Sequence, residues 1–286
     1  NKFKIEIVFT FSELQKTKFL KIIFWLPDLQ FLHFSEFFSA SQRLNNLMMI
    51  KYMYNQSDRV ILSSNSAYED LKNLIGKRLR DVAILNFVSQ PKFDLDKDIK
   101  NLNYLQKKYN FKKSYFFLPN QFWKHKNHIT VFEAMRIVNT ENFILICSGE
   151  TSDHRFKNDN YIRSLRDFIT SKKLSKRIKI LGLIPYTDVI SLMKHSVAVI
   201  NPSLFEGWSS SVEEAKSMNK EIILSNIKVH LEQNPEFGNF FNPNDAKELS
   251  KILLNTFKKK KINKSHYSLE KETRSFGNKI SKILTD

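Results

Sequence analysis

The sequence is poor in cysteine and in long apolar runs. Its single cysteine, Cys147, cannot form an internal disulfide and lies in an apolar run, residues 143–147, that is typical of a buried strand. A chain without disulfides favours a reducing compartment. The longest apolar run near the start, residues 19–26, is interrupted by Lys21 and is far shorter than the roughly 20 residues that span a bilayer. We therefore expect a cytoplasmic protein without a signal peptide or a transmembrane helix.

Acidic residues are also scarce. The chain has 29 Asp and Glu residues against 46 Lys and Arg residues, which gives a net charge of +17 at pH 7. Such a charge attracts anionic surfaces, including nucleic acids, lipid headgroups and phosphorylated substrates. Much of the excess lies in lysine runs at residues 97–113 and 258–261, which a solvated basic surface explains most simply. Because no motif for base recognition accompanies the lysines, we expect no nucleic-acid partner.

The length of 286 residues exceeds that of most single domains and predicts two units. With 42% hydrophobic residues, 25 Phe and only 6 Gly, the composition is that of a globular chain with ample core material. A lysine-rich connection separates two stretches in which apolar strands and amphipathic helices alternate. We predict a partial N-terminal domain at residues 1–90, a linker at 91–113 and a C-terminal domain at 114–286.

Both parts show the same alternation of strands and helices. In the first part, the apolar pattern predicts strands at 21–25, 59–63 and 82–86 and helices at 36–54 and 67–75, with Asn65 and Ser66 as caps of the second helix. In the second part it predicts strands at 115–118, 143–148, 178–181, 198–201 and 221–225, and helices at 129–138, 161–172, 186–194, 212–218 and 245–257. This succession is typical of an α/β fold with a doubly wound parallel sheet. Ligands of such sheets bind beyond the carboxyl ends of the strands.

Four loops after predicted strands, residues 119–128, 149–155, 182–185 and 201–214, therefore carry the residues of chemical interest. The last is the most specific, because Glu206 and Glu214 are separated by seven residues across a strand-to-helix turn. Glu206 could accept hydrogen bonds from a sugar, and Glu214 could accept two from a ribose. The alternative is that Glu214 and its neighbour Glu213 only favour the helix dipole in the first turn.

The turn between the two acids has the features of an anion site. Gly207 permits close approach of the backbone, and Ser209 to Ser211 would supply free amides at a helix start. Unpaired N–H groups and the helix dipole both favour a phosphate there. We therefore expect a phosphorylated ligand at this turn.

The segment from Pro202 to Trp208, followed by Glu214 and Ala215, resembles the E-x7-E motif of GT-B fold glycosyltransferases of family 4 type. The resemblance extends over nearly the entire chain. Residues 118–128 resemble the family's donor-phosphate loop, 180–185 its nucleobase loop, 223–226 with His230 and 242–243 its closing elements, and 25–30 with His33 the late part of its acceptor domain. It implies a Rossmann-like, doubly wound C-terminal donor domain and a partial Rossmann-like N-terminal domain.

The resemblance also implies roles around a nucleotide diphosphate sugar. Lys126 would pair with the donor diphosphate, Glu206 would hold the sugar and Glu214 would anchor the ribose, although a solvated lysine is the ordinary alternative for Lys126. Asn120 stands where many relatives carry an Arg, and it could still hydrogen-bond a phosphate. The other expected donor-binding residues are Gly207, Trp208, Ser209 and Ser210, with Leu183 and Ile184 at the nucleobase.

Three histidines raise further expectations. His33 would help to position sugar and acceptor at the reacting centre, the alternative being a structural histidine. His125 and His128, three residues apart, suggest a metal site, but no third ligand is apparent and the family needs no metal in this domain. We expect no metal, and no cofactor apart from the nucleotide sugar as co-substrate.

The predicted function is that of a retaining glycosyltransferase that acts on a saccharide or lipid-linked saccharide acceptor in cell-surface polysaccharide biosynthesis. A lipid-linked acceptor would place the enzyme at the inner face of the membrane, where lysines could contact anionic headgroups. Because the chain resembles only the second half of the family's acceptor domain, the alternative is a truncated, non-catalytic subunit that binds the donor. A third hypothesis, a basic module for nucleic acid or membranes, rests on charge alone.

Overall fold

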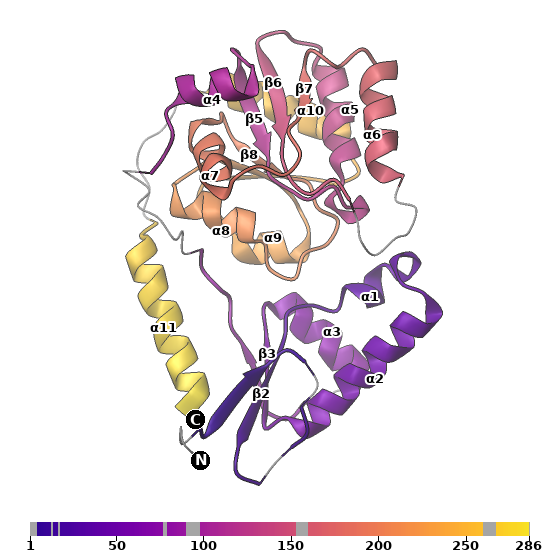
Figure 1. The fold of residues 1–286 in the computed structure, drawn as a ribbon, viewed down its shortest axis with the longest axis vertical. Helices are drawn as coiled ribbons and strands as arrows, with labels where there is room; N and C mark the ends of the chain where they lie inside the picture. Colours follow the sequence, from indigo (N-terminus) through magenta and orange to yellow (C-terminus); the bar gives the residue numbers. More distant parts are fainter. Residues whose placement is uncertain are drawn as a thin grey trace. The chain divides into compact units, whose positions relative to one another are not determined.

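The computed structural model describes residues 5–12, 14–16, 18–76, 79–89, 98–152, 160–259 and 267–285. The chain forms two compact units. The first comprises Asn1–Val88, Glu206–Trp208 and Glu270–Asp286, and the second comprises Ser89–Phe205 and Ser209–Leu269. Each unit contains a parallel sheet with helices packed against it (Figure 1), so the predicted α/β class is confirmed.

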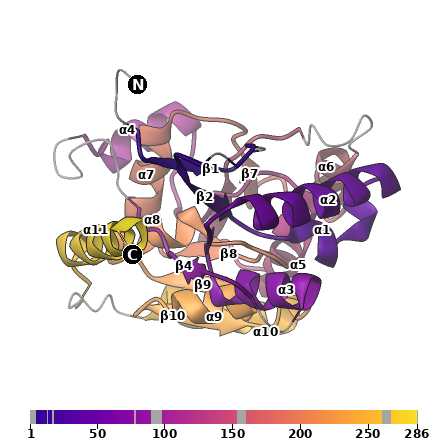
Figure 2. The ribbon, with the colours of Figure 1, turned by 90° about the horizontal axis from the view of Figure 1, so that it is seen from below.

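The first unit is built on a four-stranded parallel sheet in the order β1–β2–β3–β4. Its elements are β1 (Ile7–Thr10), β2 (Lys21–Leu26), α1 (Gln30–His33), the 3-10 turn η1 (Ser35–Phe37), α2 (Ala40–Gln56), β3 (Arg59–Leu62), α3 (Asn65–Ile75), β4 (Val82–Ile84) and α11 (Leu269–Thr285). Side chains alternate along β2, so Phe24 and Leu26 pack with α2 and α3, whereas Ile23 and Trp25 pack with α11. Figures 1 and 2 show these helices on opposite sides of the strands.

No helix was predicted after residue 257, and the residues of α11 fell within the predicted C-terminal domain, but from Glu270 onward they group with the first unit. The apolar side chains of α11, from Phe276 to Leu284, pack on the sheet around Ile23. Arg59 of β3 also donates from Nη1 to the carbonyl of Ile283 at 2.6 Å. An amphipathic helix is most stable where its apolar stripe is buried, and here the uncovered face of the first sheet provides that surface.

The second unit is built on a six-stranded parallel sheet in the order β10–β9–β8–β5–β6–β7. The strands are β5 (Ser114–Leu118), β6 (Phe143–Cys147), β7 (Ile178–Ile180), β8 (Val199–Asn201), β9 (Ile222–Ser225) and β10 (Gly238–Phe241). The chain starts in the centre at β5, runs to one edge at β7, returns to β8 beside β5 and runs to the other edge at β10. This topology confirms the predicted doubly wound sheet.

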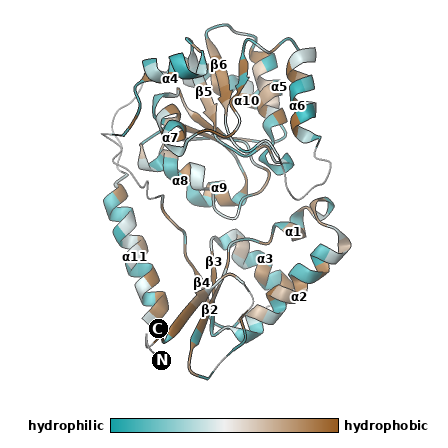
Figure 3. Cartoon of the chain, in the orientation of Figure 1, coloured by the Kyte–Doolittle hydropathy of each residue, from teal (hydrophilic) through white to brown (hydrophobic). Residues whose placement is uncertain are grey.

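Helices cover both faces of this second sheet. One face carries α5 (His128–Val138), α6 (Tyr161–Ser171) and α10 (Ala246–Lys258), and the other carries α4 (Leu102–Tyr109), α7 (Tyr186–His195) and α8 (Ser210–Ser217). The short α9 (Lys228–Gln233) follows β9. Because both faces are covered, neighbouring residues such as Phe116 and Phe117 are both fully buried, and the strands are coloured as apolar in Figure 3. No helix in the described ranges is both long and apolar enough to cross a membrane.

The predicted linker at 91–113 contains a helix instead. Residues 90–97 lie outside the described part, but residues 102–109 form α4, whose start is capped by Asn101 through a 2.8 Å bond from Tyr104 N–H. Leu105 is fully buried with Phe111 in the core of the second unit. The second unit therefore begins at Ser89 rather than at residue 114.

Side-chain caps explain where two other helices begin. α2 starts four residues later than predicted because Ser39 forms a capping box, in which Gln42 N–H donates to Ser39 Oγ at 3.1 Å and Ser39 N–H donates to Gln42 Oε1 at 2.7 Å. The cap of α3 is Ser64, not the predicted Asn65 or Ser66. In both helices a serine one position outside the helix determines its start.

A buried carboxylate joins α4 to α7. Asp188 is 2% exposed and accepts from Lys108 Nζ at 2.6 Å and from Tyr109 Oη at 2.5 Å. Burial and the Asp188 carboxylate raise the pKa of Tyr109 to about 12.

The Asp188→Ala variant should therefore lose about 2–3 kcal/mol of unfolding free energy, because two donors lose a charged acceptor. Urea denaturation measures this loss. Glu141→Ala, which breaks an exposed pair with Lys113, should leave the midpoint almost unchanged, and an equal shift in both variants would contradict the role given to Asp188.

Candidate functional site

The strand order of the second unit creates a switch point between β5 and β8. From these neighbours the sheet is built outward in opposite directions, through β6 and β7 on one side and β9 and β10 on the other. The loops after β5 and β8 follow the carboxyl ends of these two strands, and doubly wound sheets bind ligands at such a point. The expected residues Asn120 and Lys126 follow β5, and Ser209, Ser210 and Glu214 follow β8.

Asn201, the last residue of β8, holds these loops together. It is fully buried, and its Oδ1 accepts from Asn120 Nδ2 at 3.0 Å and from Ser203 Oγ at 2.7 Å. Its Nδ2 donates to Ser209 Oγ at 2.8 Å and lies 3.2 Å from Ser211 Oγ. One amide thus connects the loop after β5, the loop after β8 and the start of α8.

Lys126 lies in a short 3-10 turn, η2 (Lys124–Lys126), that is fastened to the loop after β8. The carbonyl of His125 accepts from Leu204 N–H at 2.8 Å. Asn127, in the left-handed conformation with φ 56°, donates from Nδ2 to the carbonyls of Pro202 at 3.1 Å and Pro243 at 2.9 Å. The backbone on both sides of the half-buried Lys126 is therefore fixed.

Asn120 has a structural role in addition to the expected phosphate contact. It is 5% exposed, its side chain donates to Asn201, and its carbonyl lies 3.3 Å from Nε2 of His128. Burial lowers the pKa of His128 to about 3, so this imidazole is neutral at physiological pH, and it stacks on Phe122 with ring centroids 4.3 Å apart. Within the described ranges no group of three or more His, Cys, Asp or Glu side chains could hold a metal.

The loops after β6 and β7 lie against the loop after β5. Gly149 has φ 148°, and a Cβ there would lie 2.4 Å from the carbonyl oxygen of Asn120, so only glycine fits. Its N–H donates to the carbonyl of Gly182 at 2.9 Å. Beyond this contact, Leu183 is 76% exposed and Ile184 packs against the core, and their role at a nucleobase stays a prediction. Residues 153–155 of the predicted loop at 149–155 lie outside the described part.

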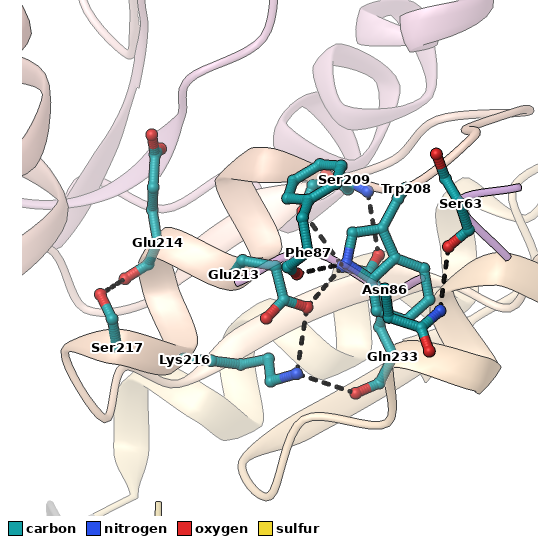
Figure 4. A network of polar contacts seen from close by, with 10 residues as sticks. All are labelled: Ser63, Asn86, Phe87, Trp208, Ser209, Glu213, Glu214, Lys216, Ser217 and Gln233. Atoms are coloured by element: carbon teal, nitrogen blue, oxygen red, sulfur yellow. Dashed lines mark hydrogen bonds and ion pairs between the residues drawn. The ribbon is translucent and has the colours of Figure 1, made fainter. Parts of the chain in front are cut away.

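The start of α8 is held by polar contacts on several sides. α8 begins at Ser210, two residues before the prediction, and Ser209 is its buried N-terminal flanking residue. Gln233 of α9 accepts from Ser209 N–H at 3.3 Å and donates to the Ser209 carbonyl at 3.0 Å (Figure 4). The N–H of Ser209 is therefore not one of the free amides that the sequence predicted. The first-turn N–H groups from Ser210 onward have no acceptor one turn back in a helix.

The adjacent acids Glu213 and Glu214 differ in their surroundings. Glu213 is 1% exposed and pairs with Lys216 at 3.0 Å and with Gln233 at 2.9 Å, so its contacts are structural. Glu214 points away from this network in Figure 4, and its Oε1 accepts from Tyr186 Oη at 2.8 Å. Burial raises the pKa of Glu214. A desolvated carboxylate with remaining acceptor capacity suits recognition of ribose hydroxyls.

Residues 206–208 group with the first unit. Glu206 is 9% exposed. A Cβ on Gly207 would lie 2.8 Å from the carbonyl oxygen of Pro27, so the backbone that approaches this glycine closely belongs to the protein itself. Trp208 donates from Nε1 to the carbonyl of Phe87 at 2.9 Å, which gives this indole a structural contact (Figure 4).

His33, also of the first unit, ends α1 with its Nε2 2.7 Å from Asp70 Oδ2. This contact fits the alternative of a structural histidine as well as a positioned reactive one. The role of His33 at a reacting centre therefore stays a prediction.

Two residues of this region were absent from the sequence-based prediction. Tyr186 and Gln233 each contact the segment around Glu214, but they lie on α7 and α9, 28 and 20 residues from their partners in the chain. The only signal in the sequence is their place beside the loops that resemble the family's motifs. Their partners become evident only from the fold.

Comparison with known proteins is consistent with this architecture. Residues 104–275 match the family model described as "Glycosyl transferases group 1". The chain is 25% identical over 158 residues to the O-antigen chain mannosyltransferase RfbU of Salmonella typhimurium (strain LT2), a match that covers 55% of this chain and 42% of that protein. The matched region thus spans less than half of that relative.

Similar solved structures include a glycosyltransferase from Rickettsia africae ESF-5, with 17% identity, a TM-score of 0.70 and coverage of 100% of this chain and 78% of the other. Anabaena Alr3699/HepE in complex with UDP has 16% identity, a TM-score of 0.71 and coverage of 92% and 72%. At these identities the likeness concerns the fold, and it confirms the predicted GT-B type. Because the family model matches more than half of the sequence, the chain belongs to the glycosyl transferases group 1 family.

Proposed function

We propose that the chain acts as a retaining glycosyltransferase that moves a sugar from a nucleotide diphosphate donor to a saccharide or lipid-linked saccharide acceptor. The observation that carries this proposal is the joining of two loops at the switch point of the second sheet. The loop that bears Lys126 and the helix start that precedes Glu214 are both fastened to the segment after β8, through Asn201 and Leu204. Family membership and the UDP complex of a protein of similar fold support a nucleotide-sugar donor.

In this proposal, charge and amides at the helix start receive the leaving diphosphate. Lys126 supplies a positive charge, and the first N–H groups of α8 supply oriented donors where negative charge develops as the sugar departs. Because the surrounding backbone is already fixed by hydrogen bonds, little reorganisation is needed during the reaction. Glu214 anchors the ribose and the exposed Leu183 faces the base.

The sugar and the acceptor are assigned to the remaining residues. Glu206 holds and orients the transferred sugar, and His33 positions sugar and acceptor. A role in cell-surface polysaccharide biosynthesis is supported by the name of the curated relative, an O-antigen chain mannosyltransferase. In that setting the acceptor is a growing saccharide or its lipid-linked form.

Peripheral contact with an anionic membrane is part of the proposal for a lipid-linked acceptor. The net charge of +17 favours such a surface. In the first unit, Phe11 and Phe19 are 73% and 90% exposed in the connection between β1 and β2, and the exposed Lys18 lies beside Phe19 in sequence. Exposed aromatic and basic side chains together suit the interface between water and lipid.

Incubation of the purified chain with labelled UDP-glucose or GDP-mannose and a lipid-linked saccharide extract tests the function. Formation of a labelled, extended saccharide that depends on Lys126 would support it. Donor binding in calorimetry without transfer to any acceptor would instead support a non-catalytic donor-binding subunit. Absence of binding to either nucleotide sugar would contradict both.

The proposed ribose contact makes donor binding sensitive to acid. Because burial raises the pKa of Glu214, its carboxylate takes up a proton at a higher pH than an exposed glutamate would. Protonation removes the charged acceptor, so the Kd for UDP or GDP should rise as the pH is lowered from neutral into the range in which this carboxylate takes up its proton. Glu214→Gln should bind about tenfold more weakly at neutral pH and should lack this part of the pH dependence. Identical pH profiles for the parent and the variant, measured by calorimetry, would contradict the assignment.

A further inference from the structure

Ser209, at the start of α8, has all its polar groups engaged inside the protein. Its Oγ accepts from Asn201 Nδ2 at 2.8 Å, and its N–H and carbonyl bond to the side-chain amide of Gln233 at 3.3 and 3.0 Å (Figure 4). Ser209 is 3% exposed, and the amides of Asn201 and Gln233 are 0% and 4% exposed. One serine is therefore held from the β8 side and from the α9 side by two buried amides.

We propose that Asn201 and Gln233 are positioning residues that set the first turn of α8 for the donor diphosphate. The inference rests on the proposed function, because it assumes that the free N–H groups of this turn bind the diphosphate. Neither residue touches the ligand. They act through Ser209, which they fix in place, so that the contacts to phosphate fall to the following residues, from the exposed Ser210 onward.

Gln233 also fixes the rotation of α8. Besides Ser209, its Nε2 donates to Glu213 Oε1 at 2.9 Å, and the same oxygen accepts from Lys216 at 3.0 Å. Because Glu213 is held on this side of the helix, the next residue, Glu214, is directed to another side, away from the network (Figure 4). The side-chain amide of Gln233 therefore positions the first turn of α8, which is proposed to bind the diphosphate. It also directs Glu214, which is proposed to bind the ribose.

The physical advantage is preorganisation. A helix start held by buried hydrogen bonds before the ligand arrives loses less conformational freedom on binding than a mobile one. Buried amides suit this task, since a glutamine side chain that both donates and accepts can pair with the N–H and C=O of one residue, and moving it would leave buried polar groups unsatisfied. Loss of this arrangement should weaken the diphosphate contacts more than the contacts to the base.

The test compares nucleoside diphosphates with nucleosides. The parent chain is titrated with UDP, GDP, uridine and guanosine, and the diphosphate that binds more tightly is carried forward with its nucleoside. Gln233→Met keeps the side-chain length but removes all three hydrogen bonds, and it should raise the diphosphate Kd about tenfold. Ser209→Ala removes the bond from Asn201 and the 3.2 Å hydrogen bond with Ser211 Oγ, and it should raise this Kd about threefold. In both variants the nucleoside Kd should change less than about twofold.

Asn239→Ala is the matched control, because this amide of β10 bonds to Glu221 at 2.9 Å, before the start of β9 and outside the loops of the site. It should leave both affinities unchanged. Equal weakening of diphosphate and nucleoside in Gln233→Met and Ser209→Ala would show a general structural lesion and overturn the proposal, as would unchanged affinities. Failure of the parent chain to bind either diphosphate would contradict the proposed function itself, and the titration of the parent reveals that outcome before any variant is made.

Discussion

The Lys126→Ala variant is expected to turn over the nucleotide-sugar donor at least about 100-fold more slowly than the parent, because one preorganised electrostatic contact to a developing charge commonly contributes that much. The backbone around Lys126 is fixed by bonds from Leu204 to the carbonyl of His125 and from Asn127 to the carbonyl of Pro202. Removal of the ammonium group should therefore remove charge without moving the loop. Steady-state kinetics with the accepted donor should show the loss mainly in kcat.

Lys124 provides a control from the same 3-10 turn. It is exposed, and Lys124→Ala removes the same charge from the protein two residues away. If the effect of Lys126 is local, this variant should retain activity within about threefold of the parent, whereas loss of net charge alone would affect both variants equally. Activity of Lys126→Ala within about twofold of the parent would reject its role at the diphosphate.

The Glu206→Ala variant is expected to lose about 100-fold or more in kcat/KM, with little change in affinity for the nucleoside diphosphate. In the proposed site Glu206 orients the sugar and not the nucleotide, so its removal should misplace the reacting carbon while the diphosphate remains bound. Parallel measurements of transfer and of UDP or GDP binding separate the two effects.

Glu206→Gln and Glu236→Ala are the companion variants. The first keeps the size and one acceptor oxygen, so it should retain more activity than Glu206→Ala if orientation through hydrogen bonds is the role of the residue. The second removes an exposed acid from the segment before β10 and should leave kinetics unchanged. A parallel loss of nucleotide affinity and transfer in Glu206→Ala would place Glu206 at the nucleotide instead of the sugar.

The strands of the second sheet could be predicted from the sequence because they are fully covered. Continuous apolar runs such as residues 143–147 occur where both faces of a parallel strand are buried. β10 was missed because its first two residues, Gly238 and Asn239, lack strand character, and pairing with β9 determines its conformation. The lysines of the stretch at 97–113 concealed α4, which packs through Leu105. Local sequence also does not show which unit contains α11. That depends on which sheet has an apolar face left to cover the apolar side chains of the helix.

The residues of the candidate site could be predicted where they lie in loops that resemble the family's motifs. Lys126, Ser210 and Glu214 follow strands of one sheet, and the fold places their loops at one edge. The sequence could not show that Ser209 is bound by Gln233 or that Glu214 is bound by Tyr186, because these contacts join residues 24 and 28 positions apart. The spacing from Glu206 singled out Glu214, but only the structure shows that the neighbouring Glu213 is buried in contacts with Lys216 and Gln233.

A crystal structure of the chain with the nucleoside diphosphate that it binds most tightly tests the central claim most directly. We expect phosphate oxygens within hydrogen-bonding distance, roughly 3 Å, of Lys126 Nζ and of first-turn N–H groups of α8, with the ribose hydroxyls on the Glu214 carboxylate. A diphosphate bound elsewhere, with Lys126 and the start of α8 still in contact with solvent, would contradict it.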